Sequence, residues 1–218
     1  MKMKITGWLA AITLILLSFA LPAQAQLAAG RDYVVIEPAQ LTDNPARIEV
    51  IEFFSYACPH CYDLHPYHLK WAAKLPSDVV FKRVPVSFNS PFYQLMARLY
   101  YALEAIGELQ KLDSAVFNAI HDKGLKLIDD KSIADWVTAQ GVDAKTFYDA
   151  YNSFGVISKA KRADQIAQTA KISGVPSLVV DGRYLVITGP QVKSHDDLLA
   201  LTDKLIDKRR AERNVKKK

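Results

Sequence analysis

The stretch that decides the fold runs from Arg47 to Tyr62 and reads R-I-E-V-I-E-F-F-S-Y-A-C-P-H-C-Y. Its first half is a nearly continuous apolar run, typical of a strand buried on both faces. A helix is expected from Cys58 to about Lys74, since Pro59 suits the first helical position. A second β-branched run follows at Val79 to Val86. Together these segments predict a βαβ unit with Cys58-Pro59-His60-Cys61 at its strand-to-helix turn.

Downstream, the periodicity changes to that of helices. From Pro91 to Phe154 apolar residues recur at helical spacing, as in Leu95, Leu99 and Leu103. This pattern predicts a long helical segment that interrupts the surrounding sheet.

Strand signals then return at Ser177 to Val180 and at Tyr184 to Ile187. Asp181-Gly182 joins them and favours a tight hairpin, because both central positions of such a turn prefer positive φ. An amphipathic helix from Ser194 to about Arg213 closes the chain. The sequence therefore predicts an α/β fold with a helical insertion.

Composition narrows the class of protein. The chain has 218 residues, of which 50% are hydrophobic and two are cysteine, so disorder and a disulfide-stapled miniprotein are excluded. The formal net charge is +5. Basic residues cluster between Asp203 and Lys218, where they could bind nucleic acid or anionic lipid. A solvated helix end is the simpler interpretation, and no nucleic-acid partner is predicted.

The N-terminus has the pattern of a secretory signal. Lys2 and Lys4 precede an apolar run from Trp8 to Leu21, and Ala23-Gln24-Ala25 supplies the small residues of a cleavage site. An uncleaved membrane anchor is the alternative, but the run is shorter than the roughly 20 apolar residues that span a bilayer comfortably. We therefore expect cleavage after Ala25 and export to a compartment in which disulfides persist.

The two cysteines are expected to differ in chemistry. Three residues apart on a helix, their Cα atoms would lie about 5 Å from each other, within the disulfide range of roughly 4.4 to 6.8 Å. Cys58 falls at the helix N-terminus, where free amides and the helix dipole lower a thiol pKa below its usual value of about 8.5. His60 would stabilise the same thiolate if it were protonated or donated a hydrogen bond. Cys61 lies one turn inside, so Cys58 is predicted to attack and Cys61 to resolve the mixed disulfide.

Three other interpretations of the motif are less favourable. A structural disulfide would close a very short loop and add little stability. Zinc could be considered because His65 and His68 share a helical face with the cysteines, but Cys58 and His68 would be about 15 Å apart. Haem attachment requires histidine directly after the second cysteine, and position 62 is tyrosine. No metal or cofactor is predicted beyond a redox-active disulfide.

Gly174-Val175-Pro176-Ser177 is the second informative segment. A proline before a strand usually just begins that strand at a sheet edge. Near a dithiol it also suggests a cis peptide bond at Pro176, which would expose the backbone of Val175 to an extended substrate.

Glu52 is a carboxyl group within the apolar strand. Burial raises a carboxyl pKa unless a cation compensates, and Lys82 or Arg83 on the next strand could supply that cation. A buried acid beneath Cys61 would exchange protons with this thiol during its cycle. A structural ion pair is the alternative.

These residues resemble the bacterial periplasmic thiol-disulfide oxidases of the DsbA type. The resemblance is carried by Glu52-Phe53-Phe54-Ser55, by Cys58-Pro59-His60-Cys61-Tyr62 and by Gly174-Val175-Pro176. The Pro-His dipeptide is quite specific, since thioredoxins carry Gly-Pro between their cysteines. The resemblance implies a thioredoxin fold with an inserted all-helical domain. It divides the chain into a signal peptide (1–25), two thioredoxin-like parts (26–90 and 156–203), a helical insertion (91–155) and a basic tail (204–218).

The resemblance also implies roles for single residues. Cys58 would be the nucleophile, Cys61 the resolving thiol, Pro176 the cis-proline and Glu52 the buried acid. Where the family usually has a lysine near this acid, Arg83 is expected. Pro66 is expected to bend the active-site helix.

The implied function is donation of the Cys58-Cys61 disulfide to reduced exported proteins in the periplasm. The implied partner is a membrane quinone reductase of the DsbB type, which would reoxidise a monomeric enzyme. A reductase or isomerase of the same fold is the nearest alternative, and a redox-inert peptide-binding chaperone is the alternative from another class.

Overall fold

The computed structural model describes residues 26–215, so the predicted signal peptide and residues 216–218 lie outside the described residues. Within residues 26–215, no helix is both long enough and apolar enough to cross a membrane. The described elements are, in order, β1 (Tyr33–Val35), β2 (Ile48–Phe54), α2 (Pro59–Ala72), β3 (Val79–Pro85), α3 (Pro91–Ala105), α4 (Leu109–His121), α5 (Asp130–Ala139), α6 (Ala144–Tyr151), α7 (Phe154–Thr169), β4 (Ser177–Val180), β5 (Tyr184–Val186) and α8 (His195–Val215).

The five strands form one mixed sheet in the order β1-β5-β4-β2-β3. β2 lies between β3, its parallel partner, and β4, its antiparallel partner. Every residue of β2 is buried, which confirms the prediction of a strand covered on both faces. β3 has a neighbour on one side only and forms an edge of the sheet.

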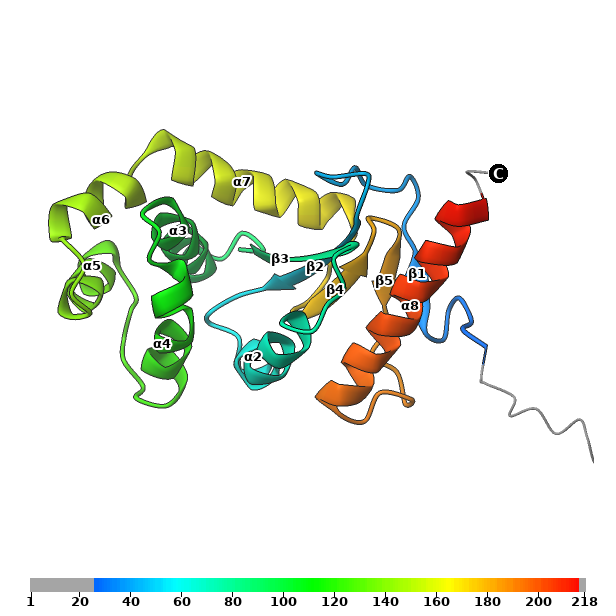
Figure 1. Ribbon diagram of the computed structural model, residues 1–218. Helices are drawn as coiled ribbons and strands as arrows, with labels where there is room; N and C mark the ends of the chain where they lie inside the picture. Colours follow the sequence, from blue (N-terminus) through cyan, green and yellow to red (C-terminus); the bar gives the residue numbers. More distant parts are fainter. Residues whose placement is uncertain (1–25, 216–218) are drawn as a thin grey trace, which may run out of the picture.

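Helices cover both faces of this sheet. Figure 1 shows α7 on one side and α2 and α8 on the other. Because side chains alternate along a strand, Val50 packs in the cluster that contains residues of α2 and α8, while Ile51 and Phe53 pack in the cluster that contains residues of α7. By this alternation Glu52, two residues after Val50, shares the face that α2 covers.

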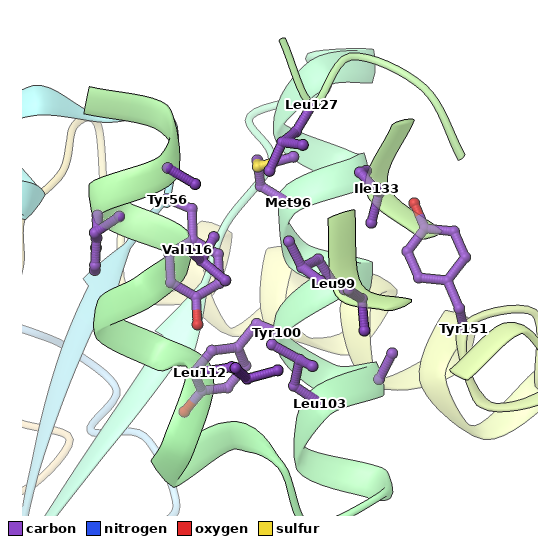
Figure 2. Packing of buried hydrophobic residues seen from close by; sticks show 14 of the residues in the cluster. Tyr56, Met96, Leu99, Tyr100, Leu103, Leu112, Val116, Leu127, Ile133 and Tyr151 are labelled. Atoms are coloured by element: carbon purple, nitrogen blue, oxygen red, sulfur yellow. The ribbon is translucent and has the colours of Figure 1, made fainter. Parts of the chain in front are cut away.

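The helices α3, α4, α5 and α6 gather beyond the edge strand β3, and α7 runs from this group back over the sheet (Figure 1). Side-chain N-caps begin four of the helices, at Ser90, Asp129, Asp143 and Ser153. Figure 2 shows the apolar packing between these helices, which also takes in Tyr56 from the segment after β2. The same cluster contains Cys58 and Cys61, so the core of the helical group reaches the dithiol.

The hairpin between β4 and β5 has the predicted backbone. Asp181 and Gly182 have φ values of 55° and 61°. A Cβ atom on Gly182 would lie 2.4 Å from the carbonyl oxygen of Gln40, so the turn needs glycine for space as well as for φ. Arg209 and Arg213 of α8 bind Asp181, and this contact fixes the C-terminal helix to the tip of the hairpin.

Candidate active site

The dithiol lies at the N-terminus of α2, as the sequence predicted. Cys58 is the N-cap residue, with extended backbone at φ −91° and ψ 118°, and Pro59 occupies the first turn. Both cysteines are free thiols. Cys58 is 6% exposed and Cys61 is fully buried, so only the first sulfur reaches the surface.

The environment of Cys58 favours its thiolate. Its pKa is lowered to about 6, chiefly by a hydrogen bond from the thiol of Cys61. Burial opposes this shift, while the backbone N–H groups of Cys61 and His60 and the charge of His60 add to it. The helix-end amides therefore contribute as expected, but the neighbouring thiol contributes more. The His60 side chain is 82% exposed, and its Nδ1 lies 3.8 Å from Oδ2 of Asp63.

The environment of Cys61 has the opposite effect. Burial raises its pKa well above the usual value, and the negative charges of Cys58 and Glu52 raise it further. The two sulfurs of one motif are thus held in opposite protonation states at neutral pH.

The segment before β4 lies against the first sulfur. The Val175-Pro176 peptide bond is cis, as suggested from the sequence. The Sγ of Cys58 lies 3.4 Å from the carbonyl oxygen of Val175, to which it donates a hydrogen bond when the thiol is protonated. The fold therefore brings together two segments that are far apart in the chain.

Glu52 is fully buried on the sheet face beneath α2. Its Oε2 accepts a hydrogen bond of 3.0 Å from Nε of Arg83, which confirms the expected cation. Its Oε1 has no hydrogen-bond partner among the described residues. Burial raises the pKa of Glu52 to about 7, because it outweighs the opposing effect of Arg83. Lys82 lies on the other face of the sheet, where it pairs with Glu49 at 2.5 Å.

A residue of α4 completes a buried cluster around Glu52 and Arg83, which the sequence did not predict. Nη1 of Arg83 donates to both carboxylate oxygens of Asp113 at 2.7 and 2.8 Å. The hydroxyl of Tyr56 donates to the same carboxylate at 2.6 Å. The guanidinium lies 3.7 Å above the ring of Phe54. Nothing in the local pattern of α4 singles out Asp113, since its role depends on the docking of α4 against β3.

Two further histidines of α2 belong to the cluster. Nε2 of His65 lies 2.8 Å from Oγ of Ser114, and Nδ1 of His68 lies 3.2 Å from Oε2 of Glu52. Burial lowers the pKa values of His65 and His68 to about 4 and about 2, so both rings are neutral at physiological pH. Their position on the helical face of the cysteines was the signal for this contact. Pro66 lies between them inside α2.

The C-terminal end of α4 holds the residues that flank the motif. The ring of Tyr62 stacks on His121 with 5.0 Å between centroids and an interplanar angle of 16°. Nε2 of His121 lies 2.8 Å from the carbonyl oxygen of Tyr56. The hydroxyl of Tyr62 donates to Asp122 at 2.7 Å. Both ends of the dithiol motif are therefore fixed to the helical group.

Comparisons with known proteins place these features in context. Residues 49–199 match the model of the DSBA-like thioredoxin domain. The chain is 42% identical over 200 residues to the thiol:disulfide interchange protein DsbA of Bordetella parapertussis, with 91% of each chain covered. It is 36% identical over 194 residues to the protein of the same name from Pseudomonas aeruginosa, with 88% of this chain and 91% of the relative covered. The crystal structure of Pseudomonas aeruginosa DsbA superposes with a TM-score of 0.81 at 35% identity, covering 86% of this chain and 97% of that one.

Proposed function

Because this chain belongs to the DsbA-like family of thiol:disulfide oxidoreductases, we propose that it donates a Cys58-Cys61 disulfide to reduced proteins that have been exported to the periplasm. The observation that carries this proposal is the opposite shift of the two thiol pKa values. A sulfur that is stable as an anion is a good leaving group and makes the disulfide easy to reduce, so the pair favours oxidation of its substrates.

The proposed reaction has two steps. A substrate thiolate attacks the sulfur of Cys58, the disulfide breaks, and Cys61 leaves with the electron pair and takes up a proton. A second substrate thiolate then attacks the substrate sulfur of the mixed disulfide and releases Cys58 as a thiolate. The substrate leaves as a disulfide, and the enzyme remains as a dithiol.

The surrounding residues are assigned roles in these steps. His60 and Pro59 belong to the N-terminal turn that stabilises the Cys58 thiolate. The backbone of Val175 and Pro176 would align an extended substrate beside Cys58, because the Val175 carbonyl oxygen lies within 3.4 Å of this sulfur. Glu52 would give a proton to Cys61 and take it back during reoxidation.

We further propose that the enzyme works as a monomer and is reoxidised by a membrane quinone reductase of the DsbB type. It needs no metal and no cofactor besides its own disulfide, and no nucleic acid. In the cell it would act after cleavage of the signal peptide at Ala25.

Trapping of mixed disulfides tests the proposal. The Cys61→Ser variant, expressed in the periplasm, should accumulate mixed disulfides with exported proteins on non-reducing gels, because its Cys58 thiolate attacks a disulfide of such a protein and no second thiol of the enzyme resolves the adduct. The matched Cys58→Ser variant should accumulate none. If neither variant traps a partner, the chain is a peptide-binding chaperone and not an exchange enzyme.

The direction of electron flow needs a second measurement. Equilibration of the purified mature chain with glutathione should leave it mostly reduced under conditions in which thioredoxin-like reductases remain oxidised. If the chain is as strongly reducing as those proteins, the reductase alternative holds.

A further inference from the structure

We propose that His68 carries protons between Glu52 and a groove beside the edge strand β3, and so connects the buried acid with solvent. This inference rests on the proposed function, because it is the proposed redox cycle that requires proton exchange at Cys61.

The groove lies where α2, β3, α3 and α7 meet. Its cavity has a volume of about 560 Å³, and its lining includes His68, Arg83 and Asp113 of the buried cluster. The exposed side chains of Lys159 and Arg162 line it as well, so the groove reaches solvent. The groove therefore gives the cluster a route outward that does not pass Cys58.

Among the described nitrogen and oxygen groups in contact with Glu52, His68 is the one that can accept its proton. The polar side chains in contact with Glu52 are Arg83, at 3.0 Å, and His68, at 3.2 Å. A guanidinium only donates hydrogen bonds, whereas a neutral imidazole has one nitrogen with a free lone pair and one that carries hydrogen. The contact with His68 lacks the alignment of a full hydrogen bond, as is common for proton-transfer pairs at rest.

The surroundings keep His68 neutral and leave its ring nitrogens free. Its side chain is 1% exposed, and neither nitrogen has a hydrogen-bond partner among the described residues. The charged and titratable groups around it are Glu52 on β2, Arg83 on β3, Asp113 on α4 and His65 on α2 itself. Burial, Arg83 and His65 all disfavour its cationic form. The ring is therefore suited to pass a proton on and not to store one.

The transfers balance over the catalytic cycle. When the disulfide is reduced, Cys61 takes the proton of Glu52. The carboxylate then accepts the proton of Nδ1 of His68, while Nε2, which is shielded from solvent at rest, accepts one from a water that enters from the groove. When the dithiol is reoxidised, Glu52 first passes its proton to Nδ1 as Nε2 releases one to water, and the resulting carboxylate then takes the proton of Cys61. The second half of the cycle restores the tautomer that the first half consumed.

His65 provides a matched control on the same helix. Its ring lies 4.9 Å from that of His68 and is buried as well. Its polar contacts are Ser114 and Asp113, and it makes none with Glu52. Loss of His65 therefore disturbs packing to a similar degree without removing the proposed carrier.

Time-resolved infrared spectroscopy of the reduced protein after a pH jump tests the inference. The carboxyl band of Glu52 is identified by its absence in Glu52→Gln. In His68→Gln the protonation of this band should slow by about tenfold or more, and in His65→Gln it should keep the wild-type rate. A wild-type rate in His68→Gln would overturn the inference.

Chemical rescue separates proton transfer from a structural role. In His68→Ala, added imidazole should restore the rate in proportion to its concentration, because the groove gives it access to the vacated site. The same imidazole should leave His68→Gln unchanged. A natively folded His68→Ala variant that imidazole does not accelerate would also overturn the inference. Neither measurement uses a substrate, so their outcome is independent of whether Cys61→Ser traps partners.

Discussion

Two buried carboxylates, Asp181 in the turn after β4 and Glu52 in β2, differ in the number of arginine side chains that bind them. Asp181 is 5% exposed and accepts hydrogen bonds from two guanidinium groups, those of Arg209 at 2.8 Å and Arg213 at 3.0 Å. Glu52 is fully buried and accepts from one guanidinium group, that of Arg83, which also binds Asp113.

The difference separates a structural site from a chemical one. A carboxylate bound by two guanidinium groups fixes the elements that carry them. When a buried carboxylate has too few cations around it, the desolvation of its charge is not compensated. Its pKa therefore rises into the range in which protons are exchanged. For Glu52 this pKa is about 7. Three measurements test this difference between the two carboxylates.

The largest expected effect is the loss of stability when the Asp181 carboxylate is removed. Asp181→Asn keeps a residue that tolerates positive φ but leaves Arg213 without a carboxylate and Arg209 with Glu212 as its one acidic partner among the described residues. We expect the free energy of unfolding to fall by about 3 kcal/mol in urea titrations. The reduction potential should not change. Asp78→Asn is the control, because Asp78 pairs with Arg210 at a site that is 46% exposed, and it should cost less than about 1 kcal/mol. A comparable loss in both variants would contradict the distinction.

The effect of removing the Glu52 charge should be of opposite sign and at most similar in size. The pKa of Glu52 is raised from 4.5 to about 7, so the folded state binds its proton more tightly than the unfolded chain does. Stability from this group is fully present below pH 4.5 and is lost as the pH rises through about 7. Glu52→Gln should therefore stabilise the protein by up to about 3 kcal/mol at pH 8 relative to pH 4.

Glu49→Gln is the matched control for that experiment. Glu49 lies on the opposite face of β2, is 3% exposed and pairs with Lys82. Its replacement should destabilise the protein, because it leaves the lysine without a buried partner. Stabilisation in both variants would show that any loss of charge in this strand is favourable.

The smallest expected effect is the difference in the free energy of unfolding between the reduced and the oxidised protein. The pKa of Cys58 is about 6 in the folded dithiol, against about 8.5 in an unfolded chain. The resulting stabilisation is fully present above pH 8.5 and disappears as the pH falls through about 6. At pH 9 the reduced protein should be more stable than the oxidised one by about 2 kcal/mol, since the short disulfide loop offsets part of the gain.

At pH 5 the thiol is protonated in the folded and in the unfolded dithiol, so this advantage of the reduced protein should be lost and the oxidised protein should be slightly more stable, by the contribution of the disulfide loop. Asp181→Asn should retain this pH dependence. If the oxidised form is the more stable one at pH 9, the thiolate does not govern the redox balance.

Local patterns in the sequence predicted the elements and the residues of the candidate site. The apolar run of β2, the proline at the start of α2 and the Asp181-Gly182 turn each depend on a few adjacent residues, and each was confirmed. Arg83 was expected beside Glu52, and strand alternation gives the reason. It is two residues from Phe81, which packs on the face that α2 covers, whereas Lys82 points the other way.

The contacts that α4 and α8 make with distant elements were not predicted. The sequence placed Arg209 and Arg213 in a solvated basic helix end. Nothing near them in the sequence indicates that they bind Asp181. Asp113 was missed for the same reason. The contact of His68 with Glu52 depends both on the helical face and on the strand beneath it, and only the first of these is visible in the sequence.

The attachment of Arg83 to Asp113 limits how far this protein could be shortened. The arginine comes from the edge strand and the aspartate from α4, and apolar side chains of the same helix cover Phe54 and Tyr56. Excision of α3 to α6 would expose an aromatic surface and leave the guanidinium with a single carboxylate. A minimal thioredoxin cut from this chain would therefore keep both sulfurs and lose the environment that makes them differ.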